Sequence, residues 1–254
     1  MSLTISLAGR TALVTGGGRG IGRAIALTLA QAGANVGLCF NRDEAAAAAS
    51  VADIEALGRR AHAWHCDVGD HAQCLALVQD CTAYFGALDI LVNNSGMASR
   101  GQCVADTAPA ELERVLRVNA LAPFWLTQAA LPHLRLRGRA DVVMVSSVAT
   151  RRLSARGAPY AMSKAALEAL AATLAKEERA HGVRCHVVSP SLTDTDMGRR
   201  LVRERGEDDI RSLDSNSPFG RVSAPQDVAN VVAFLVSDAN PYASGQNLAI
   251  DGGG

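Results

Sequence analysis

The sequence lacks an excess of charge of either sign. Lysine plus arginine and aspartate plus glutamate each number 25 among 254 residues, so the formal net charge is zero. A neutral chain has no long-range field that attracts a polyanion, which argues against nucleic acid as its main partner. The hydrophobic content of 48% is sufficient for a substantial core in a domain of this length.

Signals for membrane insertion and secretion are also missing. No run approaches the ~18 apolar residues that are needed to span a bilayer, so we expect no membrane association. The first residues, MSLTISLAGR, have neither a basic start nor a long apolar stretch, and they are not expected to form a secretory signal. The expected location is the cytoplasm.

The six cysteines include no C-x-x-C pair, which gives little support to a zinc site or a dithiol redox motif. We therefore expect no metal site. Cys39, Cys66 and Cys185 lie in apolar, strand-like runs and are expected to be small buried hydrophobic residues. Scattered cysteines without a disulfide framework are typical of a reducing compartment.

Short apolar or β-branched runs alternate with longer helical patterns along the chain. The runs predict strands at about 11–15, 36–40, 61–66, 88–92, 141–146, 183–189 and 247–250. The patterns between them predict helices at about 21–32, 43–57, 71–85, from 109 past 119, 159–178 and 227–236. This alternation requires right-handed crossovers and gives a parallel sheet that is covered on both faces. The predicted fold class is α/β, a doubly wound parallel sheet (Rossmann fold) in a single domain over 1–254.

One long stretch, 193–221, is predicted to be irregular. It is polar and contains Gly198, Gly206, Pro218 and Gly220. Long loops in compact domains are often lids or binding loops, so we expect this one to bind substrate.

A glycine-rich segment, TGGGRGIG at 15–22, lies between the first predicted strand and the first predicted helix. Glycines allow the backbone to turn tightly and to approach a pyrophosphate, and the helix N-terminus presents free N–H groups there. The alternative is a tight turn with no ligand, which the strand–turn–helix context makes the weaker interpretation. The spacing of Gly16, Gly20 and Gly22 resembles the T-G-x-x-x-G-x-G motif of the short-chain dehydrogenase/reductase family, which implies that these glycines and Ile21 bind a dinucleotide.

The end of the second predicted strand indicates which dinucleotide binds. A carboxylate there would accept a hydrogen bond from the 2′-hydroxyl and repel a 2′-phosphate, but the sequence has Asn41 and Arg42 instead. Arg19 and Arg42 could pair with a 2′-phosphate, since a guanidinium matches phosphate geometry. The resulting prediction is NADP, with NADPH preferred over NADH. The alternative is that both arginines are ordinary solvated charges.

Tyr160 and Lys164 are four residues apart on a predicted helix and would share one face. Reduction of a carbonyl requires a proton donor, and a free tyrosine has a pKa of about 10. A nearby ammonium and an oxidised nicotinamide would both lower that pKa. Taken alone, the pair could equally be an amphipathic helix with a snorkelling lysine.

The family resemblance assigns roles to these residues and to two more. Tyr160 would exchange the proton, Lys164 would lower its pKa and bind the nicotinamide ribose, and Ser147 would hydrogen-bond the substrate oxygen. Asn119 would hold a water that links Lys164 to solvent. Ser146 is the competitor for Ser147, and counting 13 residues back from Tyr160 selects Ser147.

Further matches to the family imply the remaining cofactor contacts. Asp67 and Val68 match a pair that holds the adenine, and N-N-S-G at 93–96 resembles the family's N-N-A-G. The segment after the sixth predicted strand resembles P-G-x-x-x-T, with Ser191 where glycine is usual, which puts the geometry of that loop in doubt. The residues assigned to the cofactor from these three matches are Asp67, Val68, Asn94, Ser95, Gly96, Pro190, Thr193 and Thr195.

The resemblance spans nearly the whole chain and implies hydride transfer between a nicotinamide and a carbonyl or secondary alcohol. The chain looks most like the β-ketoacyl-carrier-protein reductases, which suggests a 3-oxoacyl thioester, with the substrate carrier-bound. Arg151, Arg152 and Arg156 could receive an anionic carrier, or could be solvated loop residues. Alternatives are a sugar, polyol or steroid dehydrogenase, a non-catalytic dinucleotide-binding regulator, and a sugar-nucleotide epimerase, whose chains are normally longer.

The family is commonly tetrameric, so a homotetramer is expected, with the helices around Asn119 and after Tyr160 at an interface. The apolar residues Ala165, Leu167, Leu170 and Leu174 would suit that interface, but packing on the sheet could bury them equally well.

Overall fold

The computed structural model describes residues 5–204 and 206–254. Residues 1–4, at the start of the segment judged not to be a secretory signal, and residue 205, inside the 193–221 stretch, lie outside the described part. The described residues form a parallel sheet of seven strands in the order β3-β2-β1-β4-β5-β6-β7. The strands are β1 (Thr11–Thr15), β2 (Asn35–Phe40), β3 (Ala61–His65), β4 (Ile90–Asn93), β5 (Ala140–Val145), β6 (Val183–Pro190) and β7 (Asn247–Ile250).

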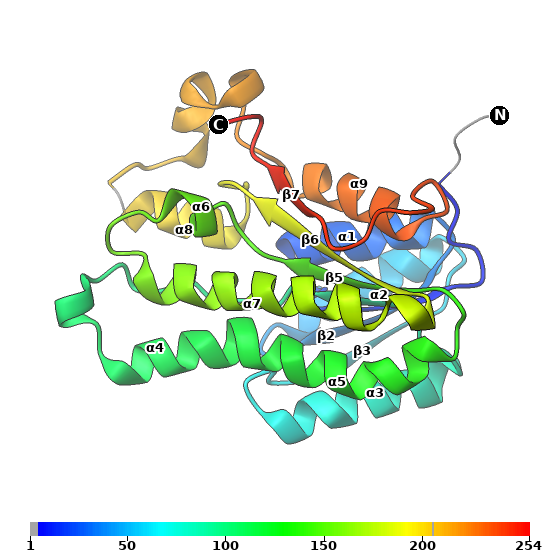
Figure 1. The fold of residues 1–254 in the computed structure, drawn as a ribbon. Helices are drawn as coiled ribbons and strands as arrows, with labels where there is room; N and C mark the ends of the chain where they lie inside the picture. The colour runs from blue at the N-terminus through cyan, green and yellow to red at the C-terminus, as the bar shows by residue number, and fades with distance from the viewer. Residues whose placement is uncertain (1–4, 205) are drawn as a thin grey trace.

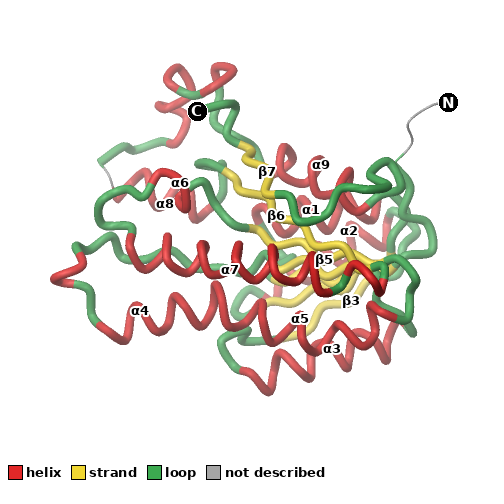
Figure 2. The backbone as a smooth tube through the Cα atoms, in the orientation of Figure 1, coloured by secondary structure: helices red, strands yellow, loops and turns green. Residues whose placement is uncertain are grey.

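Helices cover both faces of this sheet (Figures 1 and 2). They are α1 (Gly20–Gln31), α2 (Glu44–Ala56), α3 (His71–Phe85), α4 (Pro109–Leu116), α5 (Ala122–Arg135), α6 (Ala149–Arg152), α7 (Ala158–Glu177), α8 (Asp196–Glu204) and α9 (Pro225–Val236). The helices α1, α2 and α9 pack on one face, and α3, α5 and α7 pack on the other. The predicted doubly wound sheet and Rossmann fold are thereby confirmed.

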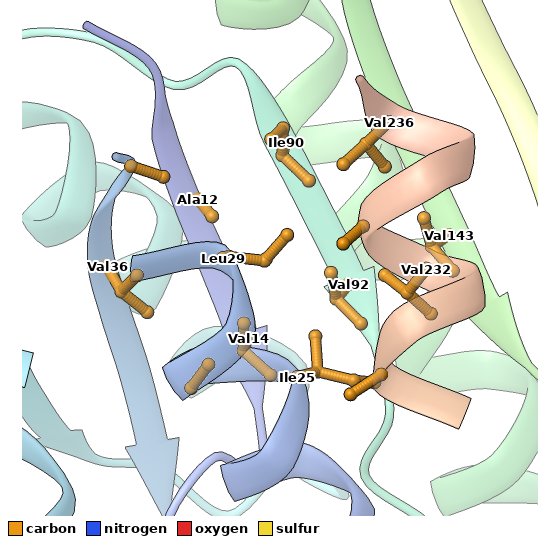
Figure 3. Close-up of a cluster of buried hydrophobic side chains, with 14 of the residues drawn as sticks. Ala12, Val14, Ile25, Leu29, Val36, Ile90, Val92, Val143, Val232 and Val236 are labelled. Carbon is orange, nitrogen blue, oxygen red and sulfur yellow. The ribbon is translucent and has the colours of Figure 1, made fainter. Parts of the chain in front are cut away.

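The central strands are apolar on both sides because each face is buried. In β1, Ala12 and Val14 contact the layer of α1 and α9, whereas Leu13 contacts the layer of α3, α5 and α7. Figure 3 shows the first of these layers, where Ile25 and Leu29 of α1 lie against the sheet. Near-continuous apolar runs are the pattern expected for such doubly covered parallel strands.

The strand order places a topological switch between β1 and β4. The chain leaves β1 for β2 and β3 on one side, and then returns to start β4 on the other side. Thr11 of β1 lies opposite Asn35 of β2, and Ala12 lies opposite Ile90 of β4. Ligands of open α/β sheets bind at the carboxyl ends of the strands at such a point.

The stretch 193–221 differs from the irregular loop that was predicted. It contains the helix α8 and two 3₁₀ segments, Ile210–Asn216 and Pro218–Gly220. The Thr195 hydroxyl accepts a hydrogen bond from the Gly198 backbone N–H at 3.1 Å and so caps the first turn of α8. Val202, Ile210 and Val222 form a small hydrophobic cluster of their own. The segment is therefore folded, because it has its own cap and its own apolar contacts.

The long helix predicted from 109 past 119 is present, but it is not uniform. A π-helical turn at Arg117–Leu121 joins α4 to α5. Such turns are rare and are often found at functional sites.

The burial of side chains tests two further predictions, one for three cysteines and one for the apolar residues of α7. Cys39, Cys66 and Cys185 are 1%, 2% and 0% exposed, which confirms their interpretation as buried hydrophobic residues. On α7, Leu167 and Leu174 pack into the core, so they belong to the sheet contact and not to a surface. None of the helices in the described ranges is both long and apolar enough to cross a membrane.

Candidate active site

The turn after β1 has backbone that only glycine accommodates well. Gly16 and Gly20 have φ values of +64° and +54°, in the left-handed region that disfavours side chains. A Cβ at Gly22 would lie 2.5 Å from Asn94 Nδ2 and would also collide with the carbonyl oxygen of Gly16. The loop is therefore closely packed around backbone, as a cradle for a ligand's phosphates requires.

The N-terminus of α1 faces the same loop and is free to bind an anion. Arg19 is the N-cap residue, in an extended conformation, and within the described part of the chain no side chain caps this helix. Its first turn also carries no acidic residue. Unpaired N–H groups and the positive end of the helix dipole suit a diphosphate. The residues present therefore fit a dinucleotide.

The ends of β1 and β4 are joined by a residue whose role the sequence did not reveal. The Thr15 hydroxyl accepts hydrogen bonds from the backbone N–H groups of Asn94 and Ser95, at 3.0 and 2.9 Å. Asn94 Nδ2 donates to the carbonyl oxygen of Thr15 at 2.8 Å. The Asn94 side chain thus holds the glycine loop in place, and Thr15 is a structural partner of that loop.

The residues expected near the adenosine lie at the same edge of the sheet. Asn41 and Arg42 follow β2 and are exposed. Asp67 follows β3 and its carboxylate accepts from the Gly69 backbone N–H at 2.9 Å, while Val68 is only 6% exposed.

Arg19 has a partner that the sequence did not indicate. Its guanidinium lies 3.6 Å from the Asp196 carboxylate on α8, and both side chains are well exposed. The pair joins the glycine loop to the 193–221 segment. A surface pair of this kind contributes little to stability, so a bound phosphate could displace it.

Tyr160 and Lys164 share a face of α7, and Ser147 meets them from the end of β5. Lys164 Nζ lies 5.8 Å from the centre of the Tyr160 ring. The Ser147 hydroxyl lies close enough to the Tyr160 phenol to lower its pKa against the effect of burial. Ser146 points elsewhere, because its hydroxyl donates to the Glu168 carboxylate at 2.6 Å. Of the two serines, the structure brings Ser147 to the tyrosine.

The electrostatics of the pair differ from the expectation in one respect. Burial raises the pKa of Tyr160 above its ordinary value, and the nearby Ser147 hydroxyl opposes that rise. The predicted lowering by Lys164 is not observed, because burial is the largest influence and Lys164 is not among the groups that shift this pKa. Burial also lowers the pKa of Lys164 to about 8, with the charge of Glu168 acting in the opposite direction.

Lys164 is firmly placed. It is 4% exposed, and its ammonium donates to the carbonyl oxygen of Val145 at 2.7 Å. This contact ties α7 to the carboxyl end of β5. The ammonium is therefore held at the strand end that also carries Ser147.

Asn119 reaches the site from the π-helical turn. Its Oδ1 accepts from the backbone N–H of Met97 at 2.9 Å, and its Nδ2 donates to the carbonyl oxygen of Met97 and to Ser163 Oγ, each at 3.0 Å. A Cβ at Gly96 would lie 3.3 Å from Asn119 Oδ1 and 3.5 Å from Lys164 Nζ. Asn119 and Lys164 therefore converge on Gly96, where the missing side chain leaves room between them.

The segment after β6 lies against the glycine loop. Pro190 is buried at the end of that strand, and Thr193 Oγ1 donates to the carbonyl oxygen of Ser191 at 3.0 Å. Thr195 Cγ2 lies 3.3 Å from the position of a Cβ on Gly20. Within the described ranges Leu153, Arg156 and Phe219 are the non-glycine residues with positive φ, so Ser191 has an ordinary backbone and the doubt about its loop is removed.

The basic residues after Ser147 are only partly available to a substrate. Arg151 donates to the carbonyl oxygen of Asn247 at 3.4 Å, and Arg152 donates to that of Gly254 at 2.9 Å. Arg156 is exposed and has a left-handed backbone, with φ +64°. Backbone strain of this kind is often found beside functional sites.

Glu168 is a polar residue of this region that the sequence analysis missed. Its carboxylate oxygen Oε1 accepts from Ser146 at 2.6 Å, from Thr150 at 2.9 Å and from Ser189 at 3.4 Å. The available signal was its position four residues after Lys164, which places both on one helix face.

The arrangement brings a hydroxyl, a phenol and an ammonium together beside a cradle for phosphates. A phenol beside a serine hydroxyl can donate a proton to, or accept one from, an oxygen held by that serine. A substrate oxygen in that place would be protonated as its carbon is reduced, or deprotonated as its carbon is oxidised.

Known proteins resemble the chain over almost its full length. Residues 16–254 match a family model described as enoyl-(acyl carrier protein) reductase. Versicolorin reductase stcU of Emericella nidulans is 37% identical over 97% of this chain and 96% of its own.

Solved structures agree with that match. A short chain dehydrogenase from Burkholderia cenocepacia in complex with NADP is 37% identical, with a TM-score of 0.87 over 97% of this chain and 98% of its own. A 7α-hydroxysteroid dehydrogenase complexed with NADH and 7-oxo glycochenodeoxycholic acid is 32% identical, with a TM-score of 0.92 over 100% of this chain and 97% of its own.

Proposed function

The chain belongs to the short-chain dehydrogenase/reductase family, and from this premise we propose that it is an NADPH-dependent enzyme that transfers hydride between a nicotinamide and a carbonyl or secondary alcohol carbon. The observation that carries the proposal is the convergence of Ser147, Tyr160 and Lys164 beside the glycine loop. Family membership alone establishes an oxidoreductase. The cofactor preference and the substrate are the proposed part.

The side chains divide the work on the substrate. Ser147 holds the substrate oxygen and Tyr160 donates the proton to it in the direction of reduction. The Lys164 ammonium, held by Val145 at 2.7 Å, stabilises the tyrosinate that remains. Asn119, which converges with Lys164 on Gly96, positions a water that returns the proton from solvent.

The dinucleotide would be held by the residues at the carboxyl edge of the sheet, and when bound it would supply the hydride. Gly16, Gly20, Ile21 and Gly22 would receive the diphosphate, since the cradle there excludes side chains. Asp67 and Val68 would bind the adenine, and Pro190, Thr193 and Thr195 would border the nicotinamide. Gly96 and Ser95 would leave space for the ribose beside Lys164.

The preference for NADPH rests on Arg42 and Arg19. Asn41 and Arg42 are exposed after β2, with no carboxylate at that strand end to repel a 2′-phosphate. One similar structure contains NADP and another contains NADH, so the family accepts both. The test is kcat/KM with each cofactor for the native chain and for Arg42→Ala. We expect NADPH to be preferred and the preference to fall in the variant; equal efficiency with NADH in the native chain would refute it.

Two substrate classes are to be separated. The sequence resemblance favours a 3-oxoacyl thioester, whereas one similar structure holds a steroid ketone. A panel of acetoacetyl-coenzyme A and a steroid ketone, each assayed with NADPH through the loss of NADPH absorbance, distinguishes them. Turnover of any member supports the proposed reaction class. NADPH binding without turnover of any member would indicate the non-catalytic regulator.

We also propose a homotetramer. Leu121 and Phe124 near the start of α5 and Met162 on α7 remain 45%, 47% and 51% exposed, although they are large and apolar. Surfaces of this kind are typical of association sites. Size-exclusion chromatography with light scattering should give four chains per particle, and a monomer would contradict the proposal.

A further inference from the structure

Glu168 occupies an unusual place for a carboxylate. It lies on α7, four residues after Lys164 and eight after Tyr160, on the side of the helix that faces the sheet. The same oxygen, Oε1, accepts hydrogen bonds from the hydroxyls of Ser146, Thr150 and Ser189. A buried or half-buried carboxylate keeps its charge when several donors compensate it.

Each of the three donors comes from a different segment around the site. Ser146 follows β5 and precedes Ser147, Thr150 belongs to α6, and Ser189 belongs to β6. The single hydroxyl proton of Ser189 is shared with Asn247 Oδ1 on β7, which is the closer acceptor at 2.7 Å. One carboxylate therefore connects α7 to the carboxyl ends of the strands that support the substrate oxygen.

The strongest of these contacts bears directly on Ser147. At 2.6 Å, the bond from Ser146 to Glu168 fixes the orientation of the residue before Ser147. The bond from Thr150 fixes the residue three positions after it. Ser147 is thus held between two anchored neighbours, and its hydroxyl is kept toward Tyr160.

The charge of Glu168 also acts on Lys164. Burial favours the neutral amine of Lys164, and Glu168 is the charged group that opposes this effect. The helix α6 also carries Arg151 and Arg152, whose guanidinium groups are directed to the carbonyl oxygens of Asn247 and Gly254. Within the described residues, no basic group forms an ion pair with Glu168, so its negative charge remains effective at the lysine.

We propose that Glu168 is a positioning residue of the active site, whose carboxylate anchors the strand end that carries Ser147 and maintains the ammonium charge on Lys164. The proposal rests on the proposed function for its catalytic consequence. Its electrostatic part concerns the chain alone and can be measured without cofactor or substrate.

The sequence makes that measurement unusually direct. The chain contains two lysines, Lys164 and the exposed Lys176. Lysine labelled with ¹³C at the ε carbon would therefore give two signals in an NMR titration, and Lys176→Arg identifies which belongs to Lys164. The variants are Glu168→Gln, which keeps an acceptor oxygen and removes the charge, and Glu168→Ala, which removes both. The control is Glu177→Gln, an exposed carboxylate on the same helix.

Glu168→Gln should lower the pKa of Lys164 from about 8 by on the order of one unit. We expect the alkaline limb of the kcat–pH profile to shift to lower pH by a similar amount. The profile is measured with NADPH and the panel member that is turned over fastest. Glu168→Ala should in addition lower kcat by about tenfold, because Ser147 loses its anchored neighbour. At acidic pH, where the Lys164 ammonium is retained, KM for NADPH should change little. Glu177→Gln should change neither quantity.

An unchanged Lys164 titration in Glu168→Gln, with the fold intact by circular dichroism, would overturn the electrostatic part. Unchanged kcat in both variants of an active enzyme would overturn the anchoring part. If the native chain turns over no carbonyl while the Lys164 titration shifts as expected, the proposed function fails and the relation between Glu168 and Lys164 stands. Should Glu168→Ala not fold, the near-isosteric Glu168→Gln still decides the charge question.

Discussion

At the scale of single residues, the site depends on how burial shifts the pKa of two groups: a phenol that becomes negative when it loses a proton, and an amine that becomes positive when it gains one. Burial raises the pKa of the Tyr160 phenol and lowers that of the Lys164 ammonium, because both shifts favour the uncharged form. Proton transfer creates a tyrosinate, so it requires the charged partner that the lysine supplies. The tyrosine is consequently an acid in the resting protein, poised to donate when an adjacent oxygen gains electrons.

Tyr160→Phe removes only the phenol oxygen and therefore tests whether Tyr160 is the proton donor. Turnover should fall on the order of 10³-fold, since a positioned general acid contributes about 10² to 10⁴ in rate. NADPH affinity, measured by fluorescence titration, should be nearly unchanged because the phosphate cradle is untouched. Tyr84→Phe, on the exposed side of α3, is the matched control and should be fully active. Turnover that survives in Tyr160→Phe would refute the role of the phenol.

The pKa of Lys164 predicts a pH dependence with a definite sign. Its value of about 8 means that the ammonium is present below that pH and is lost as the pH rises through it. Because the ammonium is proposed to bind the nicotinamide ribose, NADPH affinity should decline above pH 8 and level off once the amine is neutral. Fluorescence titrations on both sides of this value measure it, and Lys176→Met should show the same profile as the native chain. An affinity that stays constant across the range would exclude Lys164 as the binding group.

At the scale of elements, regular periodicity made most of the fold predictable. Apolar runs and helical patterns located the strands and the helices that cover them, since each has one or two faces in the core. The helix α8 was missed in this way. It spans only nine residues, so the apolar stripe of Met197, Leu201 and Val202 is short, and it lies between otherwise charged residues. The π-helical turn at Asn119 was missed as well, because it covers only five residues inside one continuous helical pattern.

The glycine loop offers a prediction about one such element. Gly22→Ala would place a methyl group 2.5 Å from Asn94 Nδ2 and against the Gly16 carbonyl, so the loop backbone must move. Overpacking of this kind costs about 1–3 kcal/mol, and NADPH affinity should fall about tenfold or more. Isothermal titration calorimetry measures the change.

Ala24→Gly, on the same helix, is the control for Gly22→Ala. It weakens α1 by about 1 kcal/mol through helix propensity without filling the cradle. It should lower the melting temperature while leaving NADPH affinity in place. Equal affinities for Gly22→Ala and the native chain would show that the cradle is not where the phosphates bind.

At the scale of the whole molecule, the proposed site and a stabilising charge cluster lie at opposite ends of the sheet strands. The proposed site residues gather at the carboxyl ends of the strands, from segments as distant as Gly16 and Thr195. These residues could be identified from sequence motifs because the motifs resemble those of a known family. That they lie close together in space is a result of the strand order. The role of Glu168 was not predicted from the sequence, because its three hydrogen-bond partners come from separate segments. No spacing along the chain reveals such a contact.

The amino ends of the strands carry a buried charge cluster instead. Asp141, at 0% exposure in β5, accepts from Arg10 at 2.8 Å and from Arg184 at 2.8 Å, and His186 lies 3.4 Å away. Burial would raise the pKa of this carboxyl, but the contacts from His186, Arg184 and Arg10 together hold it below the ordinary value of 3.8. The carboxylate therefore stabilises the folded chain at pH values above 3.8, and that stabilisation is lost as the pH falls through the lower, folded pKa.

Asp141→Asn should for this reason destabilise the protein most at neutral pH. Removing one member of a buried ion pair costs about 3–5 kcal/mol, because Arg10 and Arg184 are left without their counter-charge. Urea unfolding followed by circular dichroism should show that loss at neutral pH and a smaller difference from the native chain in acid, where Asp141 itself becomes protonated. Asp80→Asn, exposed on α3, should behave as the native chain at both pH values. A free energy of unfolding in Asp141→Asn that matches the native chain at neutral pH would mean that desolvation of the charges already cancels their attraction.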